Sequence, residues 1–221
     1  MTISKNNSFL TITVILFIGL LVMSCKKSNN VTEVKEAKEV SKIDTEAVKY
    51  SVEVDSSTVA WKGAKPAGTH NGTIKISEGF FALTEGKISG GNFIIDMKTI
   101  INLDIEDPEW NGKLVGHLSN ADFFDVDNNP YSDFAITGVE EIEGKTIVKG
   151  NLTIKNIKKN IEFPAIVSIN GDVINFKSEP FTVDRTEWDI KFKSGKFFED
   201  LKDKVIYDEI EFIIDVNAVK G

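Results

Sequence analysis

A period-two alternation of apolar and polar residues, repeated between closely spaced turn signals from Tyr50 onwards, constrains this fold more than any other feature. The segment 161–169, for example, holds Ile, Phe, Ala, Val and Ile at every second position. This period is typical of β-strands that bury one face, and the 15 Phe residues favour strands further. We expect strands over residues 58–65, 80–83, 92–97, 132–139, 146–154, 161–169, 173–181 and 205–216, with Ile74 and Ile76 on one face of a further strand.

The turn signals indicate how these strands connect. Asn71-Gly72 has the residue types that a type I′ turn requires, because both of its central residues have positive φ, and we expect a hairpin turn there. Gly144 and residues 170–172 supply further tight turns. About eight sequential strands with short connections predict an all-β, eight-stranded antiparallel barrel, since closure leaves no exposed edge. A two-sheet sandwich is the alternative.

One segment in the middle of the chain breaks the period of two. Residues 107–109 read Asp-Pro-Glu, which is a typical start of a helix: an N-cap, a proline at the first position and an acid near the positive end of the helix dipole. The short helix leads into residues 117–134, where Phe123 and Phe124 precede a turn, and we expect this stretch to be a plug or lid on the barrel. Apolar residues at helical spacing are Trp110, Leu114, Val115 and Leu118.

The N-terminus has the pattern of a bacterial lipoprotein leader. A short polar start with Lys5 is followed by the apolar run 9–23, which is too short for a comfortable membrane span of about 20 residues. The run ends just before Cys25, the only cysteine, so disulfides and multi-cysteine metal sites are excluded. We therefore expect a signal peptide over residues 1–24 and lipidation of Cys25; an ordinary secretory leader is the alternative.

Residues 25–47 are rich in Lys, Ser, Asn, Glu and Val without aromatic residues, and we expect a flexible, lipid-anchored tether there, with the barrel domain over residues 48–221. A weak helical tendency over residues 32–39 is the alternative for part of it. The net charge of −8 argues against nucleic acid as a partner. Membrane attachment through acylated Cys25 predicts a place in the bacterial cell envelope, at the outer membrane facing the periplasm or at the cell surface.

Four segments resemble the YceI-like family. Residues 117–134 contain His-Leu, Asp-Phe-Phe-Asp-Val, Pro and Phe at the spacing of the family signature. Residues 150–159 are similar to its Gly-x-Leu-Thr-Ile segment with a following lysine, residues 95–100 to one of its strand ends, and residues 184–188 to its Arg-x-x-Trp turn. The resemblance spans roughly residues 50–219, the whole of the expected domain.

The resemblance implies an extended lipocalin-like barrel that encloses a long isoprenoid tail, such as a polyprenyl chain or a quinone, without another cofactor. Apolar alternation independently supplies inward-facing candidates, although an eight-stranded barrel can also be filled by its own side chains. We expect at least one of the aromatic residues of the 117–134 segment to border a cavity. The candidate ligand-lining residues are Trp61, Ile74, Ile76, Phe93, Ile95, Phe123, Phe124, Phe134, Ile136, Val148, Leu152, Phe163, Phe176, Ile210, Phe212 and Ile214.

The polar residues do not form a recognisable catalytic or metal motif. His70 and His117 are too few for a zinc or copper site, and we expect a structural hydrogen bond from His117. Residues 125–136 lack the Gly and Glu of a calcium loop, and the acids of 104–109 suit helix capping and solvation. Arg185, the sole arginine, is expected to make a structural contact with an aromatic ring or a carboxylate.

The sequence therefore predicts a lipid carrier or sequestering protein. A non-catalytic anchored scaffold or stress-accessory barrel without a ligand is the alternative, and an enzyme has the least support. The identity of the lipid and the oligomeric state do not follow from the residues.

Overall fold

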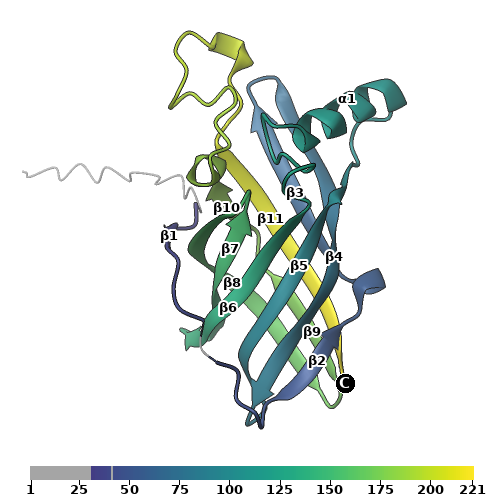
Figure 1. The fold of residues 1–221 in the computed structure, drawn as a ribbon, viewed down its shortest axis with the longest axis vertical. Helices are drawn as coiled ribbons and strands as arrows, with labels where there is room; N and C mark the ends of the chain where they lie inside the picture. The colour runs from purple at the N-terminus through teal and green to yellow at the C-terminus, as the bar shows by residue number, and fades with distance from the viewer. Residues whose placement is uncertain (1–30, 41) are drawn as a thin grey trace, which may run out of the picture.

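The computed structural model describes residues 31–40 and 42–221, which form one curved antiparallel sheet around a central axis (Figure 1). The leader and Cys25 lie outside the described residues. The elements are β1 (Lys35–Glu36), β2 (Val48–Val52), β3 (Thr58–Lys65), β4 (Gly68–Thr84), β5 (Lys87–Asn102), α1 (Pro108–Ser119), β6 (Tyr131–Ile142), β7 (Lys145–Ile154), β8 (Ile157–Asn170), β9 (Val173–Ser178), β10 (Phe181–Asp184) and β11 (Glu209–Lys220), with 3-10 turns η1 (Val54–Ser56), η2 (Arg185–Trp188) and η3 (Lys202–Lys204).

The sheet closes on itself through β11. This last strand pairs on one side with β9 and β10 and on the other with β2 and β3, while β9 also pairs with β8 and both β2 and β3 pair with β4. Consecutive pairing from β4 to β8 completes the ring. Since β2 with β3, and β9 with β10, each occupy one side, the barrel has eight sides, as the alternation predicts, and is not a sandwich.

Antiparallel pairing sorts the connections between the two ends of the barrel. Connections 66–67, 103–130, 155–156 and 185–208 lie at one end, which we call the helix end because it carries α1 (Figure 1). Connections 85–86, 143–144 and 171–172 lie at the opposite end. The opposite end has only tight turns, whereas two long connections cover the helix end.

The opposite end has the turn chemistry that two-residue hairpins need. The turn at Glu143-Gly144 has φ values of 51° and 77°, and the turn at Glu85-Gly86 has 51° and 74°. Both central residues are therefore left-handed, as a type I′ turn requires, and Gly144 lies in a turn as predicted. Gly171, with φ of 59°, does so as well.

The predicted hairpin turn at Asn71-Gly72 is wrong. Both residues lie inside β4, and the turn between β3 and β4 falls at residues 66–67. Gly72 instead permits a close approach of strands: a Cβ there would lie 1.8 Å from the carbonyl oxygen of Ile101 and 2.7 Å from the ring of Trp61. Glycine is needed at this position for space rather than for a turn.

Several strands also differ from the prediction. The single strand expected over residues 173–181 is divided into β9 and β10. The strand β4 runs from Gly68 to Thr84 without the interruption expected near residues 78–79. The last strand starts at Glu209 rather than at residue 205 because residues 205–208 turn inward to bond Arg185. Propensity alone does not reveal that tertiary contact.

The helix lies where the sequence predicts it, but one residue of its expected apolar face is exposed to solvent. The Asp107 side chain accepts hydrogen bonds from the backbone N–H groups of Glu109 and Trp110, which caps the first turn. Leu118 is the buried residue of the helix, whereas Trp110 is 62% exposed. Helical spacing therefore identified the helix but placed Trp110 on the wrong face.

The expected tether is in part a docked arm. Residues 35–36 form β1 and pair with residues 159–160 of β8. The amide of buried Asn151 accepts from the backbone N–H of Lys38 at 3.0 Å and donates to its carbonyl at 2.7 Å, replacing a backbone partner. The tether prediction is wrong for this portion of the chain. Within the described residues, no helix is long and apolar enough to cross a bilayer.

Replacement of Gly72 by alanine tests the close approach at this position. Gly72→Ala should lower the free energy of unfolding by about 1–3 kcal/mol, since the methyl group overlaps a backbone oxygen that cannot rotate away. Chemical denaturation measures the change. Gly138→Ala is the matched control, because a Cβ at Gly138 meets nothing within 4 Å; equal losses in both variants would contradict the account.

Candidate functional site

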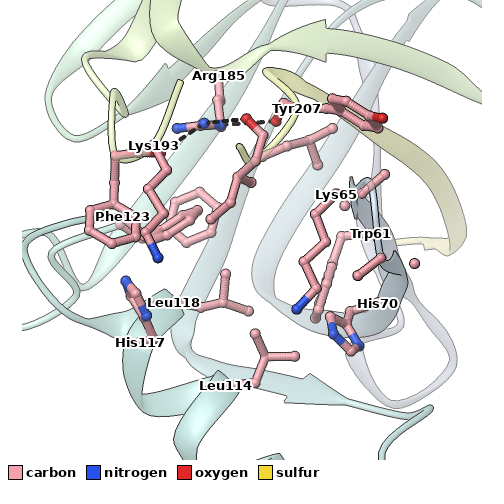
Figure 2. A pocket seen from close by; sticks show the side chains of 18 of the residues that line it. Trp61, Lys65, His70, Leu114, His117, Leu118, Phe123, Arg185, Lys193 and Tyr207 are labelled. Carbon is pink, nitrogen blue, oxygen red and sulfur yellow. Dashed lines mark hydrogen bonds between the residues drawn. The ribbon is translucent and has the colours of Figure 1, made fainter. Parts of the chain in front are cut away.

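A cavity of about 390 Å³ lies inside the barrel at the helix end (Figure 2). Its volume is within the range of about 300–1,000 Å³ that is typical of ligand pockets. The barrel strands supply Trp61, Ile74 and Phe212 to its wall. The end of β3, the 66–67 turn and the start of β4 add Lys65, Ala67 and His70. The segments 114–124 and 185–207 line the rest of the helix end, so the two long connections cover this chamber.

Two small gaps continue the chamber into the barrel. The first, of about 70 Å³, shares Ile74, Phe124 and Phe212 with the chamber. The second, of about 30 Å³, shares Phe134 and Phe163 with the first. Each gap has room for only one or two water-sized groups. The interior is therefore neither solid nor one open tunnel, but a chamber followed by two gaps.

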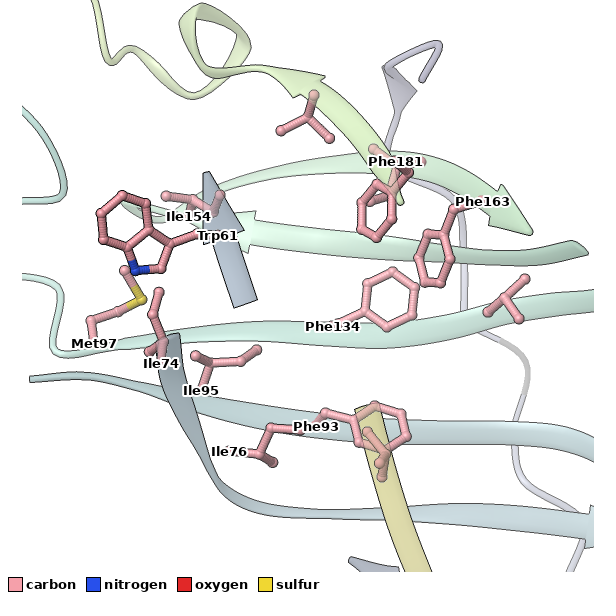
Figure 3. Close-up of a cluster of buried hydrophobic side chains, with 14 of the residues drawn as sticks. Trp61, Ile74, Ile76, Phe93, Ile95, Met97, Phe134, Ile154, Phe163 and Phe181 are labelled. Carbon is pink, nitrogen blue, oxygen red and sulfur yellow. The ribbon is translucent and has the colours of Figure 1, made fainter. Parts of the chain in front are cut away.

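Aromatic rings divide the interior. Phe163 stacks on Phe181 with ring centroids 4.3 Å apart and planes 7° apart, and Phe134 lies 5.6 Å from Phe163 (Figure 3). On the other side of the pair, the Phe212 ring lies 6.0 Å from that of Phe181. Such rings are held by packing and can rotate about their side-chain bonds without breaking the barrel's backbone hydrogen bonds. The partitions between chamber and gaps are therefore side chains.

Every candidate lining residue borders one of the three spaces, including Phe123, Phe124 and Phe134 of the 117–134 segment. That any of them contacts a ligand stays a prediction. The chamber is bordered by Trp61, Ile74, Phe123, Phe124, Ile210 and Phe212; the first gap also by Ile95, Phe134, Leu152, Phe163 and Ile214; and the second gap also by Ile76, Phe93, Ile136, Val148 and Phe176.

His117 packs instead of making the expected hydrogen bond. Its ring lies edge-on to Phe123 at 5.2 Å and to Phe192 at 4.7 Å. Its Nε2 is 3.4 Å from a carboxylate oxygen of Asp122 but has no hydrogen-bond partner among the described residues. The prediction of a hydrogen-bonding role for His117 is therefore wrong at this atom, and the imidazole joins the aromatic wall of the chamber.

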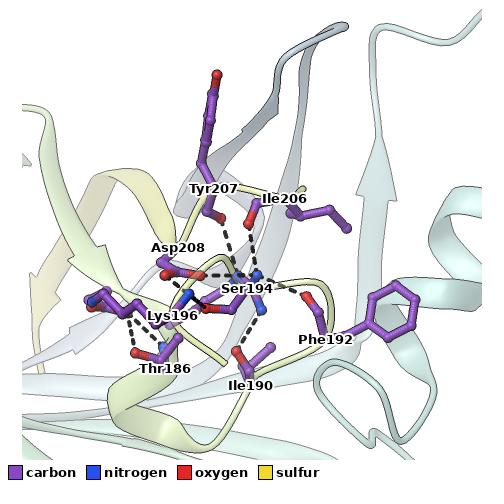
Figure 4. Close-up of polar contacts among 10 residues, drawn as sticks. Thr186, Ile190, Phe192, Ser194, Lys196, Ile206, Tyr207 and Asp208 are labelled. Carbon is purple, nitrogen blue, oxygen red and sulfur yellow. Dashed lines mark hydrogen bonds and ion pairs between the residues drawn. The ribbon is translucent and has the colours of Figure 1, made fainter. Parts of the chain in front are cut away.

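Arg185 holds the long connection 185–208 against the barrel. Its guanidinium is 2% exposed and donates to the carbonyl oxygens of Ile190, Phe192, Ile206 and Tyr207 at 2.6–3.2 Å (Figure 4). One side chain thus ties both ends of the connection together. The structural role expected for Arg185 is present, although its partners are mainly carbonyl oxygens.

A buried carboxylate completes this network. Asp208 Oδ1 lies 3.2 Å from Arg185 Nη2, and Asp208 Oδ2 accepts from the hydroxyl of fully buried Ser194 at 2.9 Å. Burial lowers the pKa of the Arg185 guanidinium from its ordinary value, and the neighbouring Asp208 opposes that shift. The guanidinium remains charged, and each of its three nitrogens donates at least one hydrogen bond.

The sequence did not identify the cationic side chains around the chamber. Lys65, Lys193 and Lys204 line it, and Figure 2 places Lys65 and Lys193 on two of its sides. Among residues 31–40 and 42–221, none of the three has an ion-pair partner within 4 Å. Lys193 has positive φ, at 49°, and lies over the Phe192 ring at 5.0 Å. Lys193 and Lys204 lie on the irregular connection 185–208, which carries no periodic signal, and Lys65 is the last residue of β3.

A polar cluster fixes the rim next to Lys65. Asp104 accepts from the Asn71 backbone N–H at 2.8 Å and from the Asn102 amide at 2.6 Å, and it lies 2.8 Å from His70 Nδ1. Burial would raise the pKa of Asp104, but these hydrogen bonds lower it below its ordinary value. Across the described ranges, no group of three or more His, Cys, Asp or Glu residues is arranged to hold a metal ion.

The fold and the site define a closed antiparallel β-barrel with an apolar internal cavity, the architecture of small-molecule-binding barrels. The YceI-like domain family matches residues 50–218, and the chain belongs to that family. No curated protein matches the chain.

Solved structures with a similar fold include the following two. BcnA of Burkholderia cenocepacia is 21% identical, with a TM-score of 0.60, over 76% of this chain and 99% of that chain. A polyisoprenoid binding domain from Saccharophagus degradans implicated in plant cell wall breakdown is 11% identical, with a TM-score of 0.56, over 79% of this chain and 99% of that chain. At these identities the likeness establishes the fold.

Removal of the Arg185 side chain should release the 185–208 connection. Arg185→Gln leaves Asp208 buried without its cation, and we expect a loss of about 3–5 kcal/mol in the free energy of unfolding, measured by chemical denaturation. The control is Lys191→Gln, which removes an exposed ion pair with Asp189 and should cost less than about 1 kcal/mol. A small loss for Arg185→Gln would mean that other contacts hold the connection.

Asp184 should make stability depend on acidity. Burial would raise its pKa, but hydrogen bonds from Lys196 and Thr186 outweigh this and lower it. A lowered folded-state pKa contributes stability above the unfolded pKa of about 3.9, and this contribution disappears as pH falls through the folded pKa. Asp184→Asn should therefore be less stable than the parent at pH 7, with the gap narrowing below pH 4 in denaturation series. Parallel curves would contradict this.

Proposed function

We propose that this protein binds a polyisoprenoid or similar long-chain apolar lipid inside its barrel, as a carrier or sequestering protein of the bacterial cell envelope. The observation that carries the proposal is the apolar chamber of about 390 Å³ with gaps behind it, all bordered by inward-facing side chains. A prenyl tail would be held by burial of its apolar area, at roughly 25 cal/mol per Å², without a charged partner.

The polarity of the interior supports one orientation of the ligand. Both gaps are lined almost wholly by apolar side chains, whereas Lys65, Lys193 and His117 surround the chamber. Trp61 also borders it, and its buried Nε1 has no hydrogen-bond partner in the described part of the chain. A lipid would thus place its polar headgroup near these donors and its tail toward the gaps.

The dimensions set a requirement on binding. A long tail exceeds the gaps of about 70 and 30 Å³, so it must displace the rings that separate them. Phe124 and Phe212 stand between the chamber and the first gap, and Phe134 and Phe163 between the two gaps. Rotation of these four side chains would join the spaces while the hydrogen-bonded wall stays intact.

Membership in the YceI-like family and the fold shared with the Saccharophagus degradans polyisoprenoid binding domain support the choice of ligand class. The leader pattern before Cys25 supports an envelope lipoprotein, anchored through that cysteine at the outer membrane and facing the periplasm. The proposal assigns no catalytic role. A ligand-free scaffold is the second candidate, and the size of the chamber disfavours it.

A blocking substitution in the chamber tests lipid binding. Gly63 lines the chamber, and a Cβ there meets nothing within 4 Å, so Gly63→Phe should fill the space without a clash. We expect the parent protein to co-purify with a long-chain apolar lipid in native mass spectrometry and solvent extraction. The variant should retain at least about fivefold less lipid at an unchanged melting temperature.

The matched control is Gly138→Phe, since Gly138 also has open space around its Cβ but borders none of the three spaces. Repeated purification of the parent protein without any lipid would refute the proposed function. Full lipid content in Gly63→Phe would refute the chamber as its binding site.

A further inference from the structure

The exposed aromatic side chains of this protein gather at the helix end. Trp110 is 62% exposed, Phe197 50%, Phe198 49% and Tyr207 45%, and all four lie on the connections 103–130 or 185–208. Tyr131, 59% exposed, follows directly on the first of these connections. The other large apolar side chains that are exposed in the described residues are Val, Ile and Leu. The aromatic residues therefore mark the end of the barrel where the chamber lies.

The Phe197-Phe198 pair is held outward by a defined structure. Both backbone N–H groups bond the carbonyl oxygen of Ser194, at 3.2 and 3.0 Å. Ser194 is fully buried and its hydroxyl bonds Asp208. The buried network that fixes the wall of the chamber therefore also presents two adjacent Phe rings to the outside.

The charges at this end decide which kind of apolar partner fits. The segment 190–207 has five lysines and three acids, and Lys191 lies 5.0 Å over the Phe197 ring. The segment 103–130 has one lysine, Lys113, which lies 4.3 Å over the Trp110 ring, and seven acids. The end as a whole is not basic, so attraction to anionic headgroups is excluded as the main force. Trp and Tyr with apolar neighbours are instead typical of side chains that enter the membrane interface.

The path of the N-terminal arm is consistent with a helix end that faces a membrane. Val31 forms a parallel bridge with Thr182, and the backbone N–H of Thr32 bonds the Thr182 carbonyl at 2.7 Å. Thr182 lies in β10, next to the start of the 185–208 connection. Five residues separate Cys25 from Val31, so the Cα atoms of these two residues lie at most about 22 Å apart. An anchor at Cys25 would therefore hold this side of the barrel close to the bilayer.

We propose that the helix end is a membrane-docking surface: Trp110, Phe197 and Phe198 insert into the interface of a lipid bilayer, with the chamber facing the membrane. The occupant is the bilayer itself, and zwitterionic lipid suffices because the insertion is apolar. The inference rests on the proposed function, because docking at this end would let a lipid pass between the bilayer and the chamber without crossing water.

The test uses the chain from Lys26 onwards, which lacks Cys25 and therefore any acyl anchor. This part folds on its own by comparison with BcnA, because 76% of this chain matches 99% of that crystallised protein. Phosphatidylcholine vesicles are the probe, and co-sedimentation gives the partition coefficient. The triple variant Trp110→Ser, Phe197→Ser, Phe198→Ser should lower it at least about tenfold, with little change on raising the salt concentration.

The matched control carries Ile142→Ser, Ile166→Ser and Val173→Ser, three exposed apolar residues away from the helix end, and should bind as the parent does. Trp110 is also a direct reporter, because the other tryptophans, Trp61 and Trp188, are buried. Brominated phosphatidylcholine should quench the parent's emission more strongly than that of Trp110→Phe, in which a lipid that enters the chamber can still quench Trp61.

A parent chain that stays in the supernatant, or equal losses in both triple variants, would overturn the docking surface. Neither triple changes a residue that lines the chamber, so the lipid content in native mass spectrometry should stay the same in all three proteins. If the parent does not bind vesicles but still contains lipid, only this inference is refuted. If the parent contains no lipid, the proposed function is refuted.

Discussion

The pairing of β11 on both of its edges is the constraint on which the structure depends. This strand joins β9 and β10 to β2 and β3, and without it the sheet would have two open edges and no enclosed interior. Closure satisfies the backbone along the whole wall, so side chains can reach the interior only from the strands and from the two ends. Since tight turns make up the connections at the opposite end, the long connections at the helix end determine access to the chamber.

The connection 185–208 is organised around the buried guanidinium of Arg185. Arg185 replaces the regular ladder hydrogen bonds that residues 190–207 do not make, and in doing so it places Phe192 and Tyr207 on the chamber wall. A buried ion pair is weak support for stability in general, but here the guanidinium also satisfies four carbonyl oxygens that would otherwise be buried without a partner. The same network therefore shapes the cavity inside and presents Phe197 and Phe198 outside.

The sequence predicted the parts of the molecule that local rules determine. Alternation identified the barrel and its inward-facing residues, and the Asp107 cap identified the start of the helix. Prediction from the sequence failed where a long-range contact decides the structure. Gly72 has the residue type of a turn, but it lies in a strand and leaves space for the Ile101 carbonyl oxygen. The arm that docks through Asn151 has the composition of a flexible tether. Motif resemblance located the cover of the chamber, yet Lys193 and Lys204 come from an irregular connection and leave no pattern in the sequence.

Under the proposed lipidation of Cys25, the docked arm would change how the domain relates to a membrane. A free tether from Cys25 to residue 47 would let the barrel sample any orientation, whereas an arm bound at Thr182 leaves five residues between the anchor and Val31 and fixes the side from which they depart. A short connection raises the effective concentration of the adjacent surface at the bilayer, so even a modest apolar affinity of the rim suffices for contact. The proposed anchor, the aromatic rim and the chamber would then all face the bilayer, and the rings of Phe124 and Phe212 would be the barrier that an entering lipid tail has to displace.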